Sequence, residues 1–298
     1  MRLLSAFKNN RLMKSLTGLT ILEFKNLLPL FSQRLDEICR SKVRNRKVGG
    51  GRKGSLPDAS HKLFFILFYL KIYPTYDLAG FVFGTDRSRP CRWVAQFLPV
   101  LEEVLGRKCV LPKRQISSIE EFFELFPETK DLFIDGTEHR VQRPKSRKNQ
   151  KRRYSGKKKA HTRQNLVASD ADRNILVLSP TKNGRSHDKR LFDKACWGSW
   201  IPPDVSLWLD MGFIGVGKIG KEVFMPKKKS KNHPLTNEEK QENQAISSIR
   251  IVSEHAIGGI KRFAAVAGIY RNKKGQDDKF ILAAAGLWNL HLQTLQIA

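Results

Sequence analysis

Apolar residues have helical spacing in the first part of the chain. Residues 58–73, DASHKLFFILFYLKIY, are almost continuously apolar and predict a buried helix. The stretch that follows predicts a short helix over about 75–83 that ends at Gly84, and then a second helix beginning at Thr85 or Asp86. Three helices joined by short connections are typical of helix-turn-helix DNA-binding domains.

Three arginines lie in the first turns of the last of these helices. They are Arg87, Arg89 and Arg92. A recognition helix presents side chains to the DNA major groove from such positions, so we expect these arginines to contact DNA. The apolar residues of the same helix that we expect in the core are Trp93, Phe97 and Leu101. The alternative is a plain three-helix bundle with a basic face.

From about residue 130 the apolar pattern becomes typical of strands. Short apolar or alternating segments, separated by polar turns, occur at 131–135, 160–170, 174–180, 205–210 and 222–226. A short helix is expected at HDKRLFDKA, a long helix after Thr236 or Asn237, and a last buried helix at KFILAAAGLWNLHLQTL. This order of elements predicts an α/β fold with flanking helices, and a mixed sheet of the ribonuclease H type is one of several arrangements that would produce it.

The change of pattern divides the chain into four parts. We expect a basic N-terminal segment and linker at 1–57, an all-α helix-turn-helix domain at 58–113, a connecting helix at 114–129 and a ribonuclease H-like catalytic domain at 130–298. The first part ends in KVRNRKVGGGRKGSLP, a charged and Gly-rich stretch that indicates a linker or a flexible DNA-tracking arm. Ser117 and Glu120 predict a capping box for the connecting helix.

The net charge of the chain indicates which class of molecule it binds. The net charge is +27, with 55 Lys and Arg against 28 Asp and Glu, and residues 140–163 contain twelve basic side chains and no carboxylate. Such a run is often only a solvated surface, but its self-repulsion favours contact with the phosphates of a nucleic acid. The chain has neither an apolar run that could span a membrane nor the features of a signal peptide, so we expect an intracellular protein with no membrane partner. The four cysteines are scattered singly, which predicts reduced thiols.

Two aspartates each end an apolar strand and precede a small turn. They are Asp135 in LFIDG and Asp210 in WLDMG, and they would emerge at one edge of the sheet if the two strands are neighbours. Phosphodiester chemistry uses divalent metals held by a few carboxylates, so both are candidate ligands of Mg²⁺ or Mn²⁺. Either aspartate alone could also be an ordinary turn former.

The long helix offers a third carboxylate. In RIVSEHAIGGIK, the residues Arg250, Glu254 and Lys261 lie within about 60° of one another around the helix axis. A carboxylate flanked by two cations on one helix face could bind both a metal and phosphates. The alternative is a solvated ion pair between Arg250 and Glu254.

Other carboxylates compete for the same site. Asp170 and Asp172 fall in a predicted hairpin turn, which explains them without chemistry. Asp188, in GRSHD, is better placed, and His187 beside it could act on a proton. A helix N-cap at His187 and Asp188 is the simpler interpretation.

With these residues identified, the sequence resembles bacterial insertion-sequence transposases of the DDE superfamily endonuclease group, relatives of the Harbinger-type nucleases of eukaryotes. The resembling blocks, in order, are IDGTEHRVQRP, YSGKKKAHTRQ, GRSHDKRL, LDMGFIG, MPKKK and NQAISSIRIVSEHAIGGIKRF. The resemblance covers about residues 58–290. Two positions depart from the family pattern, because Ser247 and Phe213 stand where tyrosines are common.

The resemblance implies a ribonuclease H-like domain with a metal-binding catalytic triad. The triad falls on Asp135, Asp210 and Glu254, and the family signature R-x3-E-x6-K adds Arg250 and Lys261 as DNA contacts. In the second block we expect further DNA contacts from Lys157, Lys158 and Lys159.

The resemblance also implies a function. We expect a DNA transposase that binds the terminal inverted repeats of its element, cuts the ends and joins them to target DNA by two-metal chemistry. We expect a homo-oligomer when two ends are paired, and a cytoplasmic location on the bacterial nucleoid. Two alternatives stay open: a stand-alone DNA endonuclease without strand transfer, and a catalytically inactive DNA-binding regulator derived from a transposase.

Overall fold

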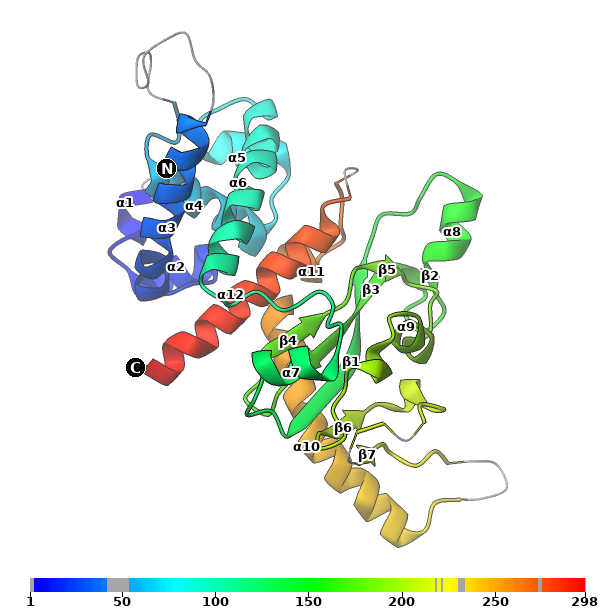
Figure 1. Cartoon of the computed structure of the whole chain (residues 1–298). Helices are drawn as coiled ribbons and strands as arrows, with labels where there is room; N and C mark the ends of the chain where they lie inside the picture. The colour runs from blue at the N-terminus through cyan, green and yellow to red at the C-terminus, as the bar shows by residue number, and fades with distance from the viewer. Residues whose placement is uncertain are drawn as a thin grey trace. The chain divides into compact units, whose positions relative to one another are not determined.

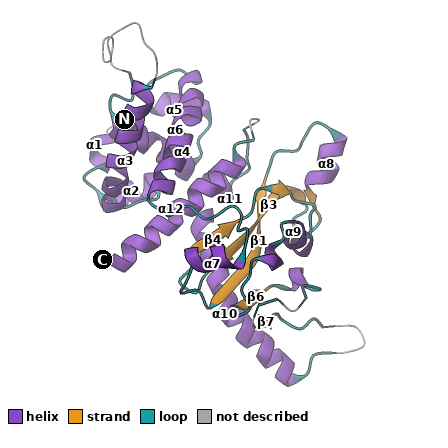
Figure 2. Ribbon diagram, in the orientation of Figure 1, coloured by secondary structure: helices purple, strands orange, loops and turns teal. Residues whose placement is uncertain are grey.

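The structure is a computed structural model that describes residues 3–41, 54–217, 219–220, 222–229, 234–272 and 275–297 (Figure 1). It divides into two compact units. The first comprises residues 1–111, 261–268 and 279–298, and the second comprises residues 112–260 and 269–278. Strands occur in the second unit, whereas the described residues of the first unit form helices and their connections (Figure 2). None of the described helices is long and apolar enough to cross a lipid bilayer.

The first unit is built around one apolar helix. Its helices are α1 (Leu3–Ala6), α2 (Asn10–Thr17), α3 (Ile21–Arg40), α4 (Ala59–Ile72), α5 (Tyr76–Val82), α6 (Ser88–Arg107), α11 (Ala264–Ala267) and, from residue 279 on, α12 (Asp277–Ile297). Every residue of α4 from Leu63 to Leu70 is buried. A helix that is apolar on all sides needs neighbours all round it, and α2, α3, α6 and α11 pack against α4.

The N-terminal segment, expected to be a basic arm and linker, is helical over most of its described length. Thr20 begins α3 with a capping box, in which its hydroxyl accepts from the Glu23 amide and the Glu23 carboxylate accepts from the Thr20 amide. The buried apolar residues of α3 recur every three or four positions, at Phe24, Leu27, Phe31 and Leu35. Residues 42–53, which contain the Gly-rich part of the expected linker, lie outside the described residues.

The C-terminal helix α12 lies at the end of the expected catalytic domain at 130–298, but most of it is not in the same unit as the rest of that domain. From residue 279 on, α12 belongs to the first unit. The Phe280 ring lies 6.1 Å from the Tyr69 ring between centroids, and the Asn289 side chain donates to the Val110 carbonyl oxygen at 2.9 Å. The apolar face of α12 is therefore buried against helices that lie more than 150 residues earlier in the chain.

Helices α4, α5 and α6 occur where the apolar pattern predicts three helices. The hydroxyl of Thr75 caps α5 by accepting from the Leu78 amide at 3.1 Å. Helix α6 begins slightly later than predicted, at Ser88, whose amide donates to the Asp86 carboxylate at 2.9 Å. Of the residues expected in its core, Phe97 and Leu101 are buried and Trp93 is half-buried.

The second unit combines a mixed sheet with flanking helices. Its elements are α7 (Ile119–Leu125), β1 (Asp131–Arg140), α8 (Arg147–Arg153), β2 (Tyr154–Ser155), β3 (Ala160–Ser169), β4 (Ile175–Leu178), β5 (Lys182–Asn183), α9 (Asp188–Lys194), η1 (Trp197–Ser199), β6 (Ser206–Leu209), η2 (Met211–Phe213), β7 (Val223–Phe224) and α10 (Asn237–Lys261), whose last residue falls in the first unit. The predicted strands and helices of this half of the chain are all present. Asp170 accepts from the Asn174 amide in the β3–β4 hairpin, as the turn pattern predicts.

The connecting helix is α7, and its cap lies one residue later than predicted. The Ser118 hydroxyl accepts from the Glu121 amide at 3.2 Å, while the Ser117 amide donates to the Glu121 carboxylate at 2.7 Å. Two serines precede two glutamates here, so the sequence satisfies the capping pattern in either register.

The sheet is mixed, with β1 at its centre. The strand order is β2-β3-β1-β6-β7, and β4 and β5 also pair with β3. Strand β3 is antiparallel to β1, whereas β6 is parallel to β1 and β7 is parallel to β6. In the β1–β6 ladder, Ile134 lies opposite Leu209. Strand β6 ends at Leu209, so Asp210 leaves the sheet there, whereas β1 continues past Asp135 to Arg140 and pairs with β3.

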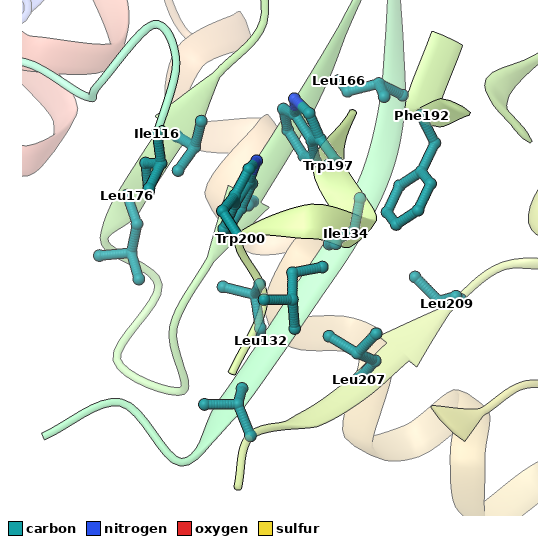
Figure 3. Close-up of a cluster of buried hydrophobic side chains, with 14 of the residues drawn as sticks. Ile116, Leu132, Ile134, Leu166, Leu176, Phe192, Trp197, Trp200, Leu207 and Leu209 are labelled. Carbon is teal, nitrogen blue, oxygen red and sulfur yellow. The ribbon is translucent and has the colours of Figure 1, made fainter. Parts of the chain in front are cut away.

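Side chains alternate between the two faces of the sheet, and each face carries its own apolar layer. Leu132 and Ile134 of β1 join the larger core, which includes α9 and the buried rings of Trp197 and Trp200 (Figure 3). On the other face, Phe133 packs with Trp208 and with Ile246 of α10. Because side chains alternate between the two faces of a sheet, Asp135 lies on the same face as Phe133, and Asp210 lies on the same face as Trp208.

Candidate active site

Asp135 and Asp210 lie side by side because of the strands that carry them. Asp135 directly follows Ile134 in β1, and Asp210 directly follows Leu209 at the end of β6. These strands are parallel neighbours with Ile134 and Leu209 in register, and both carboxylates lie on the sheet face that packs against α10. The structure thus brings together the two aspartates that the sequence predicts, but only Asp210 ends its strand, because β1 continues from Asp135 to Arg140 as the antiparallel partner of β3.

Arg250 of α10 reaches this pair. Its Nη1 atom lies 3.5 Å from Asp210 Oδ1, and only 12% of the Arg250 side chain is exposed. Its position follows from the helix pattern, because Arg250 comes one turn after the buried residue Ile246. A largely buried guanidinium next to carboxylates can balance their charge or bind a phosphate oxygen.

Asp135 is held in an environment that opposes ionisation. Burial raises the pKa of its carboxyl, and the negative charge of Asp210 raises it further. The Gly136 amide, which donates to Asp135 Oδ1 at 2.7 Å, and the charges of Arg250 and Lys157 act in the opposite direction. The net shift of the pKa is upward, so a positive charge brought near Asp135 would stabilise its ionised form.

Glu254 and Lys261 lie farther along α10. Glu254 is one helical turn beyond Arg250 and is exposed. Among the described residues, no three His, Cys, Asp or Glu side chains gather closely enough to hold a metal ion, so Glu254 does not form a closed cluster with Asp135 and Asp210. Lys261 is exposed at the end of the same helix. The structure therefore brings Asp135, Asp210 and Arg250 together, with Glu254 one helical turn beyond Arg250.

Asp188, the competing carboxylate of the GRSHD block, also lies at this site. It begins α9, but the carboxylate makes no capping hydrogen bond, and the N-cap residue is His187, whose side chain makes none either. The carboxylate instead accepts from the Gln164 amide group at 3.2 Å. The helix therefore begins where the sequence predicts, with His187 at the N-cap position, but the Asp188 carboxylate does not cap it.

Two glycines leave the space that Asp188 occupies. A Cβ atom on Gly136 would come 2.8 Å from Asp188 Cγ, and one on Gly212 would come 2.9 Å from Asp188 Oδ2. Gly136 follows Asp135 in the chain and Gly212 follows Asp210 by two positions, so Asp188 is adjacent to both aspartate segments. It approaches from the α9 face of the sheet, opposite to the side chain of Asp135.

The electrostatics of Asp188 reflect this position. Burial and then the charge of Asp135 raise the pKa of the Asp188 carboxyl to about 6, partly offset by Lys157 and His187. Lys157 therefore acts on both Asp135 and Asp188. The signal in the sequence was the GRSHD block, but only the packing of α9 over the two glycines shows its relation to Asp135.

Basic side chains predicted to contact DNA are exposed on several elements. Lys157, Lys158 and Lys159 lie in the turn between β2 and β3, and all three are exposed. Helix α8, with the sequence RKNQKRR, buries no residue and continues this basic surface. In the first unit, exposed arginines occur just before and within the first turns of α6, at Arg87, Arg89 and Arg92.

The donor set suits a hard divalent cation. In the described part of the chain, no three His, Cys, Asp or Glu side chains gather closely enough to form a complete metal cage. Mg²⁺ is commonly bound through only one or two carboxylates, with waters and substrate phosphates as its other ligands. Asp135 and Asp210 supply two such carboxylates from neighbouring strands. The residues present therefore fit a hard divalent cation.

Comparison with known proteins assigns the chain to a family. Residues 134–289, more than half of the chain, match the family described as DDE superfamily endonuclease. The chain belongs to the DDE superfamily endonuclease family. This confirms the resemblance seen in the sequence blocks, and the matched region includes Asp135, Asp188, Asp210 and Glu254.

A curated relative extends the similarity beyond the family region. The chain is 29% identical over 263 residues to the "Probable transposase for insertion sequence element IS702" of Microchaete diplosiphon. The alignment covers 88% of this chain and 90% of that protein. No solved structure matches the chain.

Proposed function

We propose that this DDE superfamily endonuclease is a DNA transposase that cuts the ends of a mobile element and joins them to target DNA. The observation that carries the proposal is the pairing of Asp135 with Asp210 beside the largely buried Arg250, where β6 ends next to its parallel neighbour β1. A relative named as an insertion-sequence transposase, similar over most of both chains, supports transposition as the purpose of the cut.

The arrangement of elements supports the finer fold assignment. A central β1 with an antiparallel neighbour, β3, on one side and parallel neighbours, β6 and β7, on the other supports a ribonuclease H-like sheet. The succession of α4, α5 and α6, with exposed arginines in the first turns of α6, supports a helix-turn-helix domain. On this assignment, Arg87, Arg89 and Arg92 bind the terminal inverted repeats.

Each residue of the site has a distinct role in the proposal. Asp135 and Asp210 would hold the divalent cation, and Glu254 would join them from α10 as the third carboxylate. A bound Mg²⁺ or Mn²⁺ supplies positive charge to the scissile phosphate and activates the attacking oxygen. Arg250 and Lys261 hold phosphate oxygens of the strand, and Lys157, Lys158 and Lys159 hold the flanking backbone.

Substitution of Asp135 by Asn tests the proposal. Asp135→Asn keeps the shape of the side chain but removes its charge, so we expect DNA binding to persist while Mg²⁺-dependent nicking is lost. Asp172→Asn is the matched control, because Asp172 is exposed in the β3–β4 turn. The readouts are electrophoretic mobility for binding and gel analysis of labelled element ends for nicking. Retained nicking in Asp135→Asn would remove this residue from the active site.

A strand-transfer assay separates the proposal from its alternatives. Pre-cut element ends are incubated with plasmid DNA and Mg²⁺, and joined products are counted. A transposase gives joined products, a stand-alone endonuclease gives nicks alone, and a DNA-binding regulator gives neither while still binding the ends. The oligomer that pairs two ends is predicted to form in the same reaction.

A further inference from the structure

The second unit contains a cavity outside the carboxylate site. Its volume is about 630 Å³, and it lies between the segment that joins β4 to β5 and the end of α9. Volumes of about 300–1,000 Å³ are typical of cavities that take small organic ligands. This cavity could therefore hold one nucleotide but not a DNA double helix.

The lining of the cavity is basic. Its cationic residues are Arg114, Arg152, Lys182 and Lys194, and no carboxylate occurs among the described residues that line it. Arg114 is fixed in place, because its Nη2 atom lies 2.6 Å from Asp278 Oδ1, while its buried Nη1 atom has no hydrogen-bond partner in the described residues. Four cations from four different segments converge on one space, which favours an anionic occupant.

The rest of the lining mixes apolar and polar residues. Pro180, Leu191 and Trp197 are apolar, whereas Asn183 and Ser186 carry hydrogen-bonding groups. Inorganic phosphate would use only the cations. A nucleotide would use the cations and the rest of the lining, because its phosphate pairs with the cations and its base has an apolar face and polar edges.

The cavity lies within reach of the same DNA strand as the carboxylates. Helix α9 begins at Asp188, against the Asp135 and Asp210 segments, and ends at Lys194 in the lining of the cavity. A helix of 7 residues is about 10 Å long, at about 1.5 Å per residue. Successive phosphates of one B-DNA strand rise about 3.4 Å along the helix axis, so this length spans about three nucleotides measured along that axis.

We propose that this cavity binds an unpaired nucleotide of the DNA strand beside the cut, about three nucleotides from the scissile phosphate. The inference rests on the proposed function, which brings DNA to Asp135. Arg114, Lys182 and Lys194 hold the phosphate. The apolar part of the lining, which includes Pro180 and Leu191, holds the base after it leaves the double helix. Unstacking a base costs a few kcal/mol, which the contacts in the cavity offset.

The test compares two DNA substrates and two kinds of lysine variant. The full-length chain with Asp135→Asn is titrated, in EDTA, with a fluorescent blunt duplex and with the same duplex carrying unpaired nucleotides next to the cut position. The double variant Lys182→Gln/Lys194→Gln removes two exposed cations from the cavity. The control, Lys228→Gln/Lys240→Gln, removes two exposed cations that do not line the cavity.

We expect the cavity variant to weaken binding of the unpaired substrate about tenfold or more relative to the blunt duplex, since one charge-assisted hydrogen bond contributes about 1.5–3 kcal/mol. We expect the control to weaken both substrates equally. Equal losses for both substrates in the cavity variant would overturn the proposal. Deoxyadenosine monophosphate that binds in a Lys182-dependent way, without a preference for unpaired DNA, would identify a free nucleotide as the occupant and would also overturn it.

The outcomes for the cavity and for the transposase are distinguishable. The wild-type chain could fail to cut DNA while the preference for the unpaired substrate still depends on Lys182 and Lys194. This result would count against the transposase alone. A chain that cuts DNA with no such dependence would count against the cavity alone.

Discussion

At the scale of single residues, the tightest constraint is the space that glycines leave for Asp188. A Cβ atom on Gly136 would overlap the Asp188 carboxylate. We expect Gly136→Ala to lower the free energy of unfolding by about 1–3 kcal/mol, because a well-packed site does not accept an added methyl group without rearrangement. In an Asp188→Ala background this loss should largely disappear. The measurement is urea denaturation followed by tryptophan fluorescence, arranged as a double-mutant cycle.

Gly156 provides the control for this cycle. A Cβ atom at Gly156 would meet nothing within 4 Å, so Gly156→Ala should change stability little in either background. Additive effects of Gly136→Ala and Asp188→Ala would contradict the contact. Substitution of either residue alone cannot decide the question, because each could act through unrelated packing.

The pKa of Asp188 predicts a dependence of stability on pH. The folded state raises this pKa from the ordinary value of 3.8 to about 6, so it binds the proton more tightly than the unfolded state does. The contribution of Asp188 to the free energy of unfolding therefore falls as pH rises from about 4 to about 6 and is constant above that range. In EDTA, we expect Asp188→Asn to be more stable than the wild type at about pH 7.5. Near pH 4 the two proteins should have similar stability, and a constant difference across this range would contradict the prediction.

The sequence predicts the candidate residues of the site but not all of their spatial relations, for physical reasons. Asp135 and Asp210 could be found because each directly follows a short apolar run, which is a local pattern, although β1 continues beyond Asp135. Asp188 was a competing candidate from its GRSHD block, but its relation to the two aspartates depends on how α9 packs over Gly136 and Gly212, which no local pattern shows. The same limit applies to Glu254, whose helical face is predictable but whose distance from the aspartates is not.

At the scale of elements, Asp277 anchors the start of α12 in the second unit. Its buried carboxylate lies 2.9 Å from Arg163 Nε and 3.2 Å from His139 Nε2. Burial alone would raise the pKa of Asp277, but the His139 hydrogen bond and the Arg163 charge outweigh it, so the pKa lies below its usual range. Removing one partner of a buried ion pair leaves the other uncompensated.

We therefore expect Asp277→Asn to lower the free energy of unfolding by about 3 kcal/mol at neutral pH. A depressed carboxyl pKa contributes stability above the ordinary value near 3.8, and this contribution is lost as pH falls through the lower folded-state pKa. The loss caused by Asp277→Asn should shrink accordingly in acid. Denaturation curves at several pH values measure it, with Asp172→Asn at an exposed position as the control. An equal loss at every pH would show that packing, rather than charge, explains it.

The sequence predicts whether a segment forms a helix or a strand better than it predicts which of the two units that segment belongs to. The hydrophobic periods of α4, α10 and α12 and the apolar runs of β1, β3 and β6 are local signals, and these elements are present. The assignment of α12 depends on Phe280 reaching Tyr69, across about 210 residues of chain. No local pattern carries that information. The helices of residues 3–40 were missed because their basic side chains masked a buried stripe that includes Phe24 and Phe31.

At the scale of the whole molecule, the net charge of +27 makes DNA affinity depend on salt. Each phosphate contact releases bound counterions, so the logarithm of the binding constant falls with the logarithm of salt concentration by about 0.9 per contact. This dependence counts contacts whatever the sequence of the DNA. It can therefore show whether the arginines of α6 touch the backbone or lie on a solvated surface.

The deciding variant replaces Arg87, Arg89 and Arg92 together by Gln. If all three hold phosphates, the slope of the salt dependence should decrease by about 3. Lys8, Arg11 and Lys14, three exposed cations at and before α2, form the matched control, since their replacement by Gln removes the same charge. Fluorescence anisotropy with a duplex of the element end, titrated at several salt concentrations, gives both slopes. Equal decreases for the two triple variants would mean that charge acts only through the overall field of the protein, and α6 would then lose its role as the DNA-reading helix.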